Sequence, residues 1–356
     1  MGDLVLNVGS SSLKAALFAD DGSGERLWQE QVCLEAGGAA GGLEAALHHW
    51  LEPRLEPWWP QIRRVGHRLV HGGERFTAPT RVTPAVLEEL ESLSALAPLH
   101  NPPALAAIRR LRQHRPQLPQ WVCFDTAFHA SLPAAAACYA LPAAWREGGC
   151  RRYGFHGLSH QHLSELATSR WRELGRAGHP RLISCHLGAG CSLAAVRAGA
   201  SIDTTMGFTP LEGLVMASRS GSVDPGLLLH LLRRGVSPEQ LEQGLNHASG
   251  LRGLSGLSGD WRELGAAATA GHAGARLALD VFRHRLLAGI GAMAASLGGV
   301  DMIGLTGGIG ANDATLLAHL RTELAWLGSV HWLQVTADEE AMIARLLGRL
   351  GGDGCG

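Results

Sequence analysis

Residues 4–18, LVLNVGSSSLKAALF, place two short apolar segments on either side of a glycine–serine tip. Residues 4–7 and 13–18 have the composition of β-strands, and Gly9 with the serines after it supplies the turn. This arrangement predicts a β-hairpin whose tip is polar.

The same order of residue types returns in LISCHLGAGCSLAAV at residues 182–196, where the matched positions are shifted by 179 residues. Asn7 corresponds to His186, and Gly9 corresponds to Gly188. Because the shift is half the chain length, it favours a duplicated domain over a solenoid of short repeats. Chance similarity between two glycine-rich hairpins is the alternative.

The rest of the chain alternates helical and extended patterns, which is typical of an α/β fold. An uncharged run at residues 286–300 is too short and too glycine-rich for a membrane span, so we expect a buried helix there. Helices are predicted at residues 85–97, 103–112 and 160–174, strands at 64–69 and 121–124, and a loop at 175–180.

The composition excludes several classes of protein. A net charge of −1 provides no broad basic field for nucleic acid or an anionic membrane. The seven cysteines are scattered and form no C-x-x-C pair, which suits a reducing compartment better than a disulfide framework. No basic segment precedes the first apolar run, so we expect a cytoplasmic protein. Lys14, at the first hairpin, is the one lysine among 31 basic residues.

Glycine-rich turns let backbone N–H groups approach an anion closely, so the two hairpin tips are candidate phosphate-binding loops. Neither tip matches a P-loop or a dinucleotide-binding fingerprint. A third glycine run at residues 306–312 lies between an apolar segment and a helical one, and is a candidate nucleoside or phosphate turn.

Local motifs along most of the chain resemble the acetate kinase family in order and spacing. They are NVGSSSLK (7–14), GHRLVHGGE (66–74), APLHNPP (97–103), FDTAFH (124–129), YGFHG (153–157), HLG (186–188), MGFTPLEG (206–213), RSGSVDP (219–225), GIG (308–310) and DEE (338–340).

The resemblance implies a duplicated ribonuclease-H-like fold of the actin-like ATPase type, with an active-site cleft between the domains. Domain I would cover residues 1–127 and a C-terminal helix at 341–350, and domain II, the nucleotide-binding domain, would cover 128–340. The implied reaction is direct, in-line phosphoryl transfer between ATP and acetate, giving ADP and acetyl phosphate. A homodimer and Mg²⁺, with Mn²⁺ as an alternative, are also implied.

Catalytic roles come from the resemblance and agree with the needs of phosphoryl transfer, which requires cations near the transferring group. Arg68 and Arg219 match the two arginines of the family's active site, and His156 and His100 match histidines that stabilise the transition state. Without the resemblance, either arginine would be read as a surface residue. The spacing of His156 and His160 could suggest metal binding, but no third ligand or H-E-x-x-H glutamate accompanies them, which argues against zinc. His67, His71 and His129 are expected to be structural.

Magnesium prefers oxygen ligands, usually one or two carboxylates together with substrate phosphates. The resemblance assigns the metal to Asp125, Glu339 and Asn7, with a weaker claim for Glu340. A helix cap or turn is the alternative role for Asp125.

Nucleotide and acyl sites are implied in the same way. The four apolar residues that match the acyl pocket could equally be core residues. They are Val70, Leu99, Phe155 and Pro210, with Arg68 for the carboxylate. The residues implied at the nucleotide and its phosphates are Asn7, Ser10, Ser12, Lys14, His186, Gly188, Gly190, Asp260, Trp261, Arg262, Gly308, Gly310 and Asn312.

The sequence departs from the family mainly in the nucleotide loops. Ala189 and Cys191 stand where the family has asparagine and serine, Ala311 replaces a glutamate, and Asp338 replaces an asparagine. Three alternatives therefore stay open: a propionate or other acyl kinase, a kinase that uses another donor such as pyrophosphate, and a degenerate nucleotide-binding sensor.

Overall fold

The computed structural model describes residues 1–9, 12–21, 23–34, 39–98 and 100–352. The chain divides into two compact units. Unit 1 contains Met1–Ala130 and the C-terminal segment from Asp338, and unit 2 contains Ser131–Ala337. The domain boundaries expected after residue 127 and before residue 341 stay a prediction, and each lies three residues from the limit of a unit.

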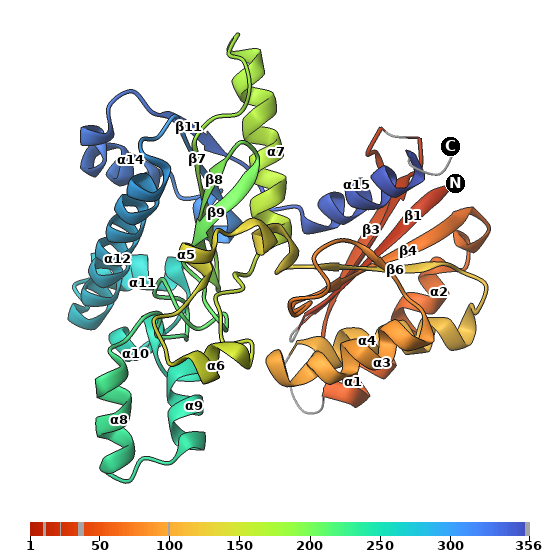
Figure 1. Ribbon diagram of the computed structural model, residues 1–356, viewed down its shortest axis with the longest axis horizontal. Coiled ribbons are helices and arrows are strands. Elements are labelled where there is room, and N and C mark those ends of the chain that lie inside the picture. Colours follow the sequence, from red (N-terminus) through yellow and green to blue (C-terminus); the bar gives the residue numbers. More distant parts are fainter. Residues whose placement is uncertain (10–11, 22, 35–38, 99, 353–356) are drawn as a thin grey trace. The chain divides into compact units, whose positions relative to one another are not determined.

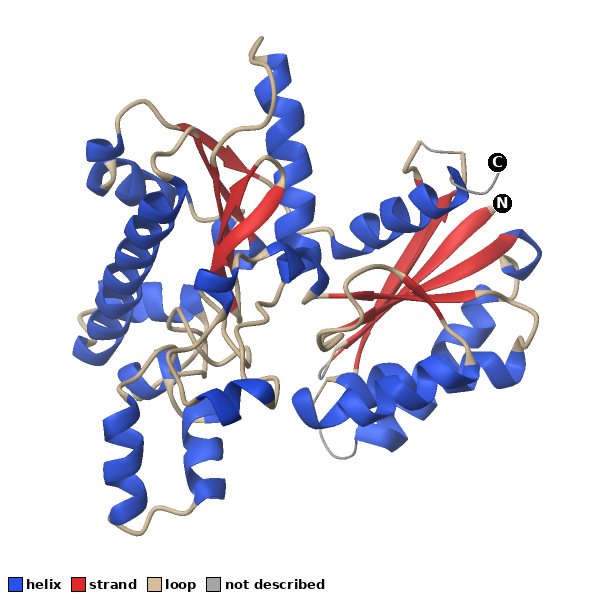
Figure 2. Ribbon diagram, in the orientation of Figure 1, coloured by secondary structure: helices blue, strands red, loops and turns tan. Residues whose placement is uncertain are grey.

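Unit 1 is built on a six-stranded sheet (Figures 1 and 2). Its strands are β1 (Gly2–Val8), β2 (Ser12–Ala19), β3 (Arg26–Cys33), β4 (Ile62–Leu69), β5 (Thr80–Arg81) and β6 (Gln120–Phe124), in the order β3-β2-β1-β4-β6-β5. The predicted hairpin is confirmed, because β1 and β2 are antiparallel with Asn7 opposite Lys14. β1 pairs in parallel with β4, and β4 with β6.

Helices cover both faces of this sheet. They are α1 (Ala39–Ala45), the π-helix η1 (Ala46–Leu51), α2 (Glu52–Leu55), η2 (Trp59–Gln61), α3 (Pro84–Ser92), η3 (Leu93–Leu96), α4 (Asn101–His114), η4 (Ala127–Ser131, which crosses the unit boundary) and α15 (Glu339–Gly352). Helix α4 begins two residues before the predicted start at residue 103. Two prolines are tolerated in its first turn, where the backbone N–H groups have no partner inside the helix.

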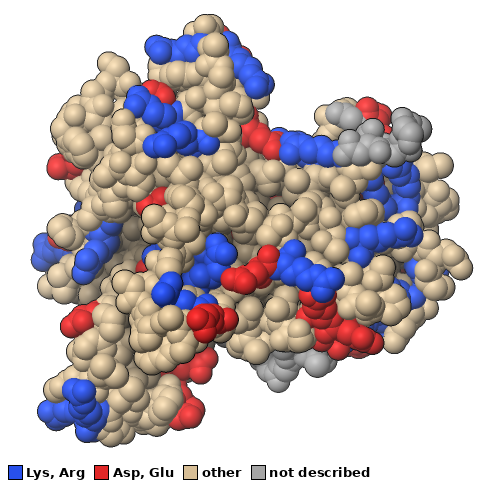
Figure 3. All heavy atoms as spheres, viewed as in Figure 1, with Lys and Arg blue, Asp and Glu red and all other residues tan. Residues whose placement is uncertain are grey.

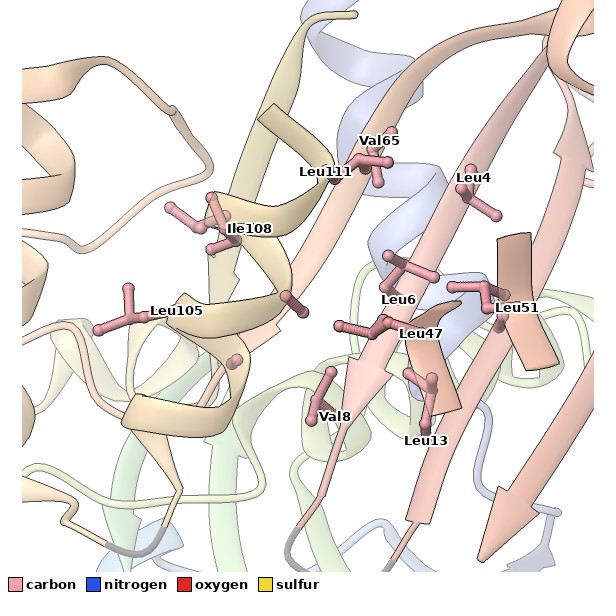
Figure 4. Packing of buried hydrophobic residues seen from close by; sticks show 14 of the residues in the cluster. Leu4, Leu6, Val8, Leu13, Leu47, Leu51, Val65, Leu105, Ile108 and Leu111 are labelled. Atoms are coloured by element: carbon pink, nitrogen blue, oxygen red, sulfur yellow. The ribbon is translucent and has the colours of Figure 1, made fainter. Parts of the chain in front are cut away.

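The core of unit 1 lies between the sheet and the helices that precede β6. Leu4, Leu6 and Val8 alternate along β1 and lie on one face, with leucines of η1 and α4 beside them (Figure 4). Each fully buried leucine contributes roughly 1.5–3 kcal/mol to stability. On the other face, α15 lies so close to β4 that a Cβ on Gly66 would be 2.6 Å from Cγ2 of Ile343.

Unit 2 repeats the strand order of unit 1. Its strands are β7 (Leu182–Leu187), β8 (Cys191–Arg197), β9 (Ala200–Thr204), β10 (Met302–Thr306) and β11 (His331–Gln334), in the order β9-β8-β7-β10-β11. β8 is antiparallel to both β7 and β9, and β10 is parallel to both β7 and β11. Because β1 to β4 and β6 have the same order and directions, the predicted duplication is confirmed.

The helices of unit 2 are α5 (Ala134–Ala137), α6 (Ala143–Glu147), α7 (Gly157–Glu173), α8 (Pro225–Arg233), α9 (Pro238–His247), α10 (Gly250–Ser255), α11 (Trp261–Thr269), α12 (Ala273–Leu297), α13 (Gly307–Gly310), α14 (Ala314–Glu323) and η5 (Ala325–Leu327). The buried helix expected at residues 286–300 is the second half of α12. The third glycine run forms a helical turn, α13. Of the helices formed by the described residues, none combines the length and apolar character needed to cross a bilayer.

Candidate active site

Four predicted site residues of unit 1 come together at one edge of its sheet. Asn7, Arg68 and Asp125 lie at the carboxyl ends of β1, β4 and β6, and Glu339 is the first residue of α15. Arg68 donates from Nη2 to Asp125 Oδ2 (2.5 Å) and from Nε to Asp125 Oδ1 (3.1 Å). Its Nε also lies 3.5 Å from Glu339 Oε2. The carboxyl ends of parallel strands are where α/β folds place ligands.

Asn7 links the charged groups of this cluster. Its Nδ2 donates to Glu339 Oε2 (3.1 Å) and to Glu340 Oε1 (2.7 Å), while its Oδ1 accepts from Arg68 Nη1 (3.2 Å). The three residues expected to hold a metal, Asn7, Asp125 and Glu339, are therefore neighbours. Glu340, which had the weaker claim from sequence, makes the shorter contact with Asn7.

Burial and charge set the protonation of this cluster. Asp125 is almost completely buried, and burial raises its pKa to about 6, against the opposing effect of Arg68. Glu339 adds to the upward shift because two nearby carboxylates repel each other. Burial alone would lower the pKa of Arg68, but Asp125 and Glu339 raise it above its ordinary value, so Arg68 stays a cation.

The donor atoms of this cluster fit Mg²⁺, since two carboxylates and an amide oxygen are hard oxygen ligands. Among the described residues, no group of three or more His, Cys, Asp and Glu side chains forms a metal-binding cluster by itself. A metal held here would therefore depend partly on the amide oxygen, on water or on substrate oxygens.

The loop after β4 carries Val70, the first residue of the predicted acyl pocket. Val70 is buried, and the loop is held by Asn101, whose Oδ1 accepts from His71 N (3.2 Å) and whose Nδ2 donates to His71 O (3.0 Å). His100, the other predicted residue of this region, immediately precedes α4. Leu99 lies outside the described residues.

The first hairpin tip contributes Ser12 and Lys14 to the predicted phosphate loop. Gly9 N donates to Ser12 O (2.8 Å), which closes the turn. Lys14 is exposed and directly opposite Asn7, so both side chains lie on the same face of the hairpin. Ser10 lies outside the described residues.

Unit 2 brings His156 and His186 together. Their rings are stacked with centroids 4.2 Å apart. His156 precedes α7 in a left-handed conformation (φ 56°), which is uncommon for a residue other than glycine, and strain of this kind concentrates at functional sites. His186 Nδ1 lies 2.8 Å from Ser159 Oγ, which fixes the second ring.

Ser192 connects His156 to the buried His160. Its Oγ lies 2.8 Å from His156 Nδ1 and 2.8 Å from His160 Nε2, and the far side of His160 contacts Ser184 Oγ (2.7 Å). A hydroxyl has one proton to donate, so Ser192 can donate to only one of the two rings. The hydrogen bonds through Ser192 thus explain the spacing of His156 and His160.

Ser192 is a residue that sequence reasoning missed. The signal that could have found it is the register of the second hairpin, which places Ser192 opposite His186. Side chains opposite each other across two antiparallel strands lie on the same face.

Arg219 and Gly190 lie beside His156. A Cβ on Gly190 would be 3.1 Å from His156 Nε2 and 3.8 Å from Arg219 Nη2, so a larger residue would crowd both side chains. Arg219 donates from Nη1 to Pro210 O (2.8 Å), which brings together two more predicted residues. Burial lowers the pKa of Arg219 from its usual high value. Phe155 is fully buried next to His156.

A cavity of about 900 Å³ in unit 2 is lined by many of the predicted nucleotide-binding residues. Those on its wall are Gly188, Asp260, Trp261, Arg262, Gly308 and Asn312, and Ala189 and Asp313 line it as well. His186, Gly190 and Gly310, also predicted, are not among the lining residues.

Internal hydrogen bonds organise this cavity. Trp261 Nε1 donates to Asp313 Oδ2 (2.5 Å), and Asn312 Nδ2 donates to Gly308 O (3.0 Å). Asp260 caps α11 by accepting from Arg262 N (2.8 Å), so its carboxylate is occupied by the helix. The structure therefore gives Asp260 a structural role in addition to its place on the cavity wall.

Two residues that depart from the family pattern, Cys191 and Asp338, form hydrogen bonds in the structure. Cys191 donates from Sγ to Gly188 O (3.2 Å), and burial raises the pKa of its thiol to about 12, so it stays protonated. Asp338 pairs with Arg26 Nη2 at 2.5 and 2.6 Å and accepts from Ala341 N (2.9 Å) at the start of α15.

Comparison with known proteins places the chain among enzymes of one kind. The sequence model of the acetokinase family matches residues 3–345. The acetate kinase of Synechococcus sp. (strain JA-2-3B'a(2-13)) is 48% identical over 361 residues, covering 92% of this chain and 88% of that protein. Among solved structures, a propionate kinase from Francisella tularensis is similar with a TM-score of 0.86 at 34% identity, covering 97% of this chain and 98% of that one. The acetate kinase of Porphyromonas gingivalis is similar with a TM-score of 0.85 at 34% identity, covering 97% of this chain and 98% of that one.

Proposed function

The chain belongs to the acetokinase family, and from that membership we propose that it transfers a phosphoryl group reversibly between ATP and acetate. The products of the forward reaction are acetyl phosphate and ADP. The observation that carries this proposal is the cluster of Asn7, Arg68, Asp125 and Glu339 at the carboxyl ends of the strands of unit 1. It combines a carboxylate-binding cation with oxygen ligands for a metal.

Arg68 would bind the acetate carboxylate. A guanidinium has five N–H groups, and Arg68 uses three of them on Asp125 and Asn7. The other two are free to donate to an acyl carboxylate, and the acidic neighbours keep the guanidinium charged and fixed in direction. Val70 of unit 1 would contact the acyl methyl group.

Asn7, Asp125 and Glu339 would hold Mg²⁺, with Mn²⁺ as an alternative. When bound, such an ion neutralises negative charge on the phosphate oxygens. Lys14 and Ser12 would add donors from the first hairpin tip, together with Ser10.

In unit 2, Arg219 and His156 would stabilise the transferring phosphoryl group. Its equatorial oxygens carry spread negative charge in the transition state, and a buried cation stabilises that charge strongly. Pro210 O anchors the guanidinium of Arg219, while Ser192 and the stacked ring of His186 orient His156. For His100, in unit 1, we propose a role in stabilising the transition state.

The 900 Å³ cavity of unit 2 would bind the nucleoside, which makes residues 128–340 the nucleotide-binding domain. Trp261 offers an aromatic surface, and Gly188, Gly190, Gly308 and Gly310 permit close approach of phosphates to the backbone. We also propose a cytoplasmic homodimer.

A hydroxylamine trap for acyl phosphate tests the proposal, with ATP, GTP or pyrophosphate as donor and acetate, propionate or butyrate as acceptor. We expect ATP with acetate to give the highest kcat/KM. Acyl phosphate formed from pyrophosphate alone would refute ATP as the donor, and no product from any pair would refute the kinase activity.

Substitution of the two arginines tests their roles. Arg68→Ala and Arg219→Ala should each lower kcat by about 100-fold or more, because a comparable arginine is worth about 10³–10⁵ in rate. The matched control is Arg170→Ala on α7, since that side chain is more than half exposed. Losses below tenfold in both variants would contradict the assignment.

A further inference from the structure

Three polar side chains of unit 2 form a cluster that has no part in the roles assigned above. Tyr139 Oη donates to Glu212 Oε2 (2.5 Å), and Arg152 Nη2 donates to Glu212 Oε1 (2.7 Å). The guanidinium of Arg152 also lies over the Tyr139 ring, with Cζ 5.0–6.0 Å being the usual range for such a contact and 5.5 Å the distance here. We call Tyr139, Arg152 and Glu212 the carboxylate cluster.

The carboxylate cluster is partly withdrawn from water. Figure 3 shows charged side chains in small separate groups on the surface of the chain. The side chains of Arg152 and Glu212, in contrast, expose only 16% and 34% of their area. Hydrogen bonds to an ionised group are about twice as strong as neutral ones, and partial exclusion of water strengthens them further. The three side chains therefore hold one another in fixed positions.

The carboxylate cluster also binds the backbone that follows β9. Arg152 Nη1 donates to Thr205 O (3.1 Å) and to Met206 O (3.0 Å). Phe208 N donates to Tyr139 Oη (2.9 Å). Two members of the cluster thus fix the path of four consecutive residues.

Gly207, in the middle of this segment, passes directly over the cluster. A Cβ on Gly207 would overlap both the carboxylate and the phenolic oxygen of the cluster. The carbonyl oxygen of Gly207 accepts from Tyr153 N (3.0 Å) and from Gly154 N (3.3 Å). These two donors lie three and two residues before His156, so the cluster holds the approach to that histidine through one backbone carbonyl.

The same segment anchors Arg219. Arg219 Nη1 donates to Pro210 O (2.8 Å). Pro210 lies two residues after Phe208 and two residues before Glu212. The carboxylate cluster therefore holds the chain on both sides of the carbonyl that directs the guanidinium.

We propose that Tyr139, Arg152 and Glu212 are positioning residues for Arg219 and His156. This inference rests on the function proposed above, in which those two groups act on the transferring phosphoryl. A misplacement of about 1 Å at a catalytic group can cost about 100-fold in rate. None of the three residues lines the 900 Å³ cavity, so their loss should lower kcat without weakening nucleotide binding.

Removal of one hydroxyl is the first test. Tyr139→Phe deletes the bond to Glu212 and the bond from Phe208 N, and should lower kcat about tenfold or more with an unchanged dissociation constant for ATP. Tyr153→Phe is the matched control, because its hydroxyl donates to Gly149 O (3.1 Å), outside the cluster. The control should keep kcat within about twofold.

Substitution of the carboxylate separates geometry from charge. Glu212→Gln keeps an oxygen for Arg152 and can donate its N–H to the Tyr139 oxygen, so kcat should stay within about fivefold of the unaltered value. Glu212→Ala removes both contacts and should lower kcat about tenfold or more. Equal losses in the two variants would contradict a positioning role.

A double-mutant cycle tests whether the cluster acts through Arg219. In a chain that already carries Arg219→Ala, Tyr139→Phe should lower kcat only about threefold or less, because one of the two groups that it positions is absent. A general defect of folding would lower kcat by the same factor in both backgrounds. That result would overturn the proposal.

Backbone hydrogen exchange separates this inference from the kinase activity, because it needs no substrate. Tyr139→Phe should speed exchange at residues 205–213 about tenfold, whereas Tyr153→Phe should leave that segment unchanged. Unchanged exchange in Tyr139→Phe, or faster exchange with full kcat, would refute the positioning role. An unaltered chain that forms no acyl phosphate, with the expected difference in exchange, would refute the kinase activity and leave the hold of the cluster on this segment in place.

Discussion

Asp338 precedes the metal-binding candidate Glu339, and its removal should weaken both the start of α15 and metal binding. The carboxylate of Asp338 caps α15 at Ala341 N and pairs with Arg26. Glu339 and Glu340 both accept hydrogen bonds from Asn7 in the first turn of this helix. The cap therefore holds the turn that orients them.

The magnitude follows from the two contacts that Asp338→Ala removes. Loss of a helix cap costs about 1 kcal/mol. The pair with Arg26 is about 30% exposed on both sides, so screening by water limits its value to about 0.5 kcal/mol. We expect the free energy of unfolding to fall by about 1.5 kcal/mol. Asp338 acts on Glu339 through the helix turn, so we apply the low end of the roughly 10–100-fold effect of outer partners of metal ligands and expect the Mg²⁺ concentration for half-maximal activity to rise about tenfold.

Urea unfolding and Mg²⁺ titration of the initial rate measure the two effects. Asp338→Asn keeps a capping oxygen and should shift the metal midpoint less than threefold. Thr83→Ala removes a comparable cap from α3 in the same unit, where Thr83 Oγ1 accepts from Val86 N (3.2 Å). Its stability should fall by a similar amount with no change in the metal midpoint.

The result that refutes this reasoning is an Asp338→Ala protein that loses stability as Thr83→Ala does but keeps its Mg²⁺ midpoint. Asp338 would then support the helix without orienting Glu339. A double-mutant cycle with Arg26→Gln measures how much of the effect belongs to the ion pair.

Three further predictions concern the loops and the buried histidines. Ala189→Asn should lower the KM for ATP about tenfold by adding one hydrogen bond to a phosphate, with the KM for acetate unchanged; unaltered or poorer use of ATP would mean that this loop does not contact ATP phosphates. Val70→Ala should shift preference toward propionate by opening room for one methylene, worth roughly 1–3 kcal/mol, and an unchanged ratio of kcat/KM for the two acids would remove Val70 from the acyl pocket. Burial lowers the pKa of His67 and of His71 to about 4. Between about pH 4 and pH 6.5 the unfolded chain therefore binds more protons than the folded one. The free energy of unfolding should rise with pH across this window by roughly 3 kcal/mol per histidine. The raised pKa of Asp125 acts in the opposite direction up to about pH 6, so urea unfolding should show the net rise reduced but not abolished, and a flat profile would contradict the assignment.

The hairpins were predictable because their signals are local. A strand has a side-chain period of two and a turn needs glycine or small polar residues, so residues 4–18 and 182–196 fix both strands and the tip between them. The offset between the copies then indicated duplication, and β2 and β8 begin at equivalent positions, Ser12 and Cys191.

The contacts that sequence reasoning missed join residues that are distant along the chain. Arg26 and Asp338 are 312 positions apart, and each by itself has the pattern of a surface charge. That pair depends on α15 returning to the first sheet, which the resemblance implied and periodicity does not determine. The resemblance also assigned Asn7 and Glu340, which are 333 positions apart, to one metal site. The sequence indicated a turn at residues 306–312 but not its helical form, α13, because glycine has low helix propensity and tertiary context decides its conformation.

The shared hydroxyl of Ser192 makes the two histidine rings depend on each other. When Ser192 donates to His156 Nδ1, the His160 ring must carry its hydrogen on Nε2 and donate it to Ser192. His160 Nδ1 then accepts from Ser184. When Ser192 donates to His160 Nε2 instead, His160 carries its hydrogen on Nδ1 and donates it to Ser184. His156 then carries its hydrogen on Nδ1 and donates it to Ser192. The row from Ser184 to His156 thus has two self-consistent proton arrangements for neutral rings. A tautomer change at His156, the partly buried end of this row, requires the fully buried His160 to change with it.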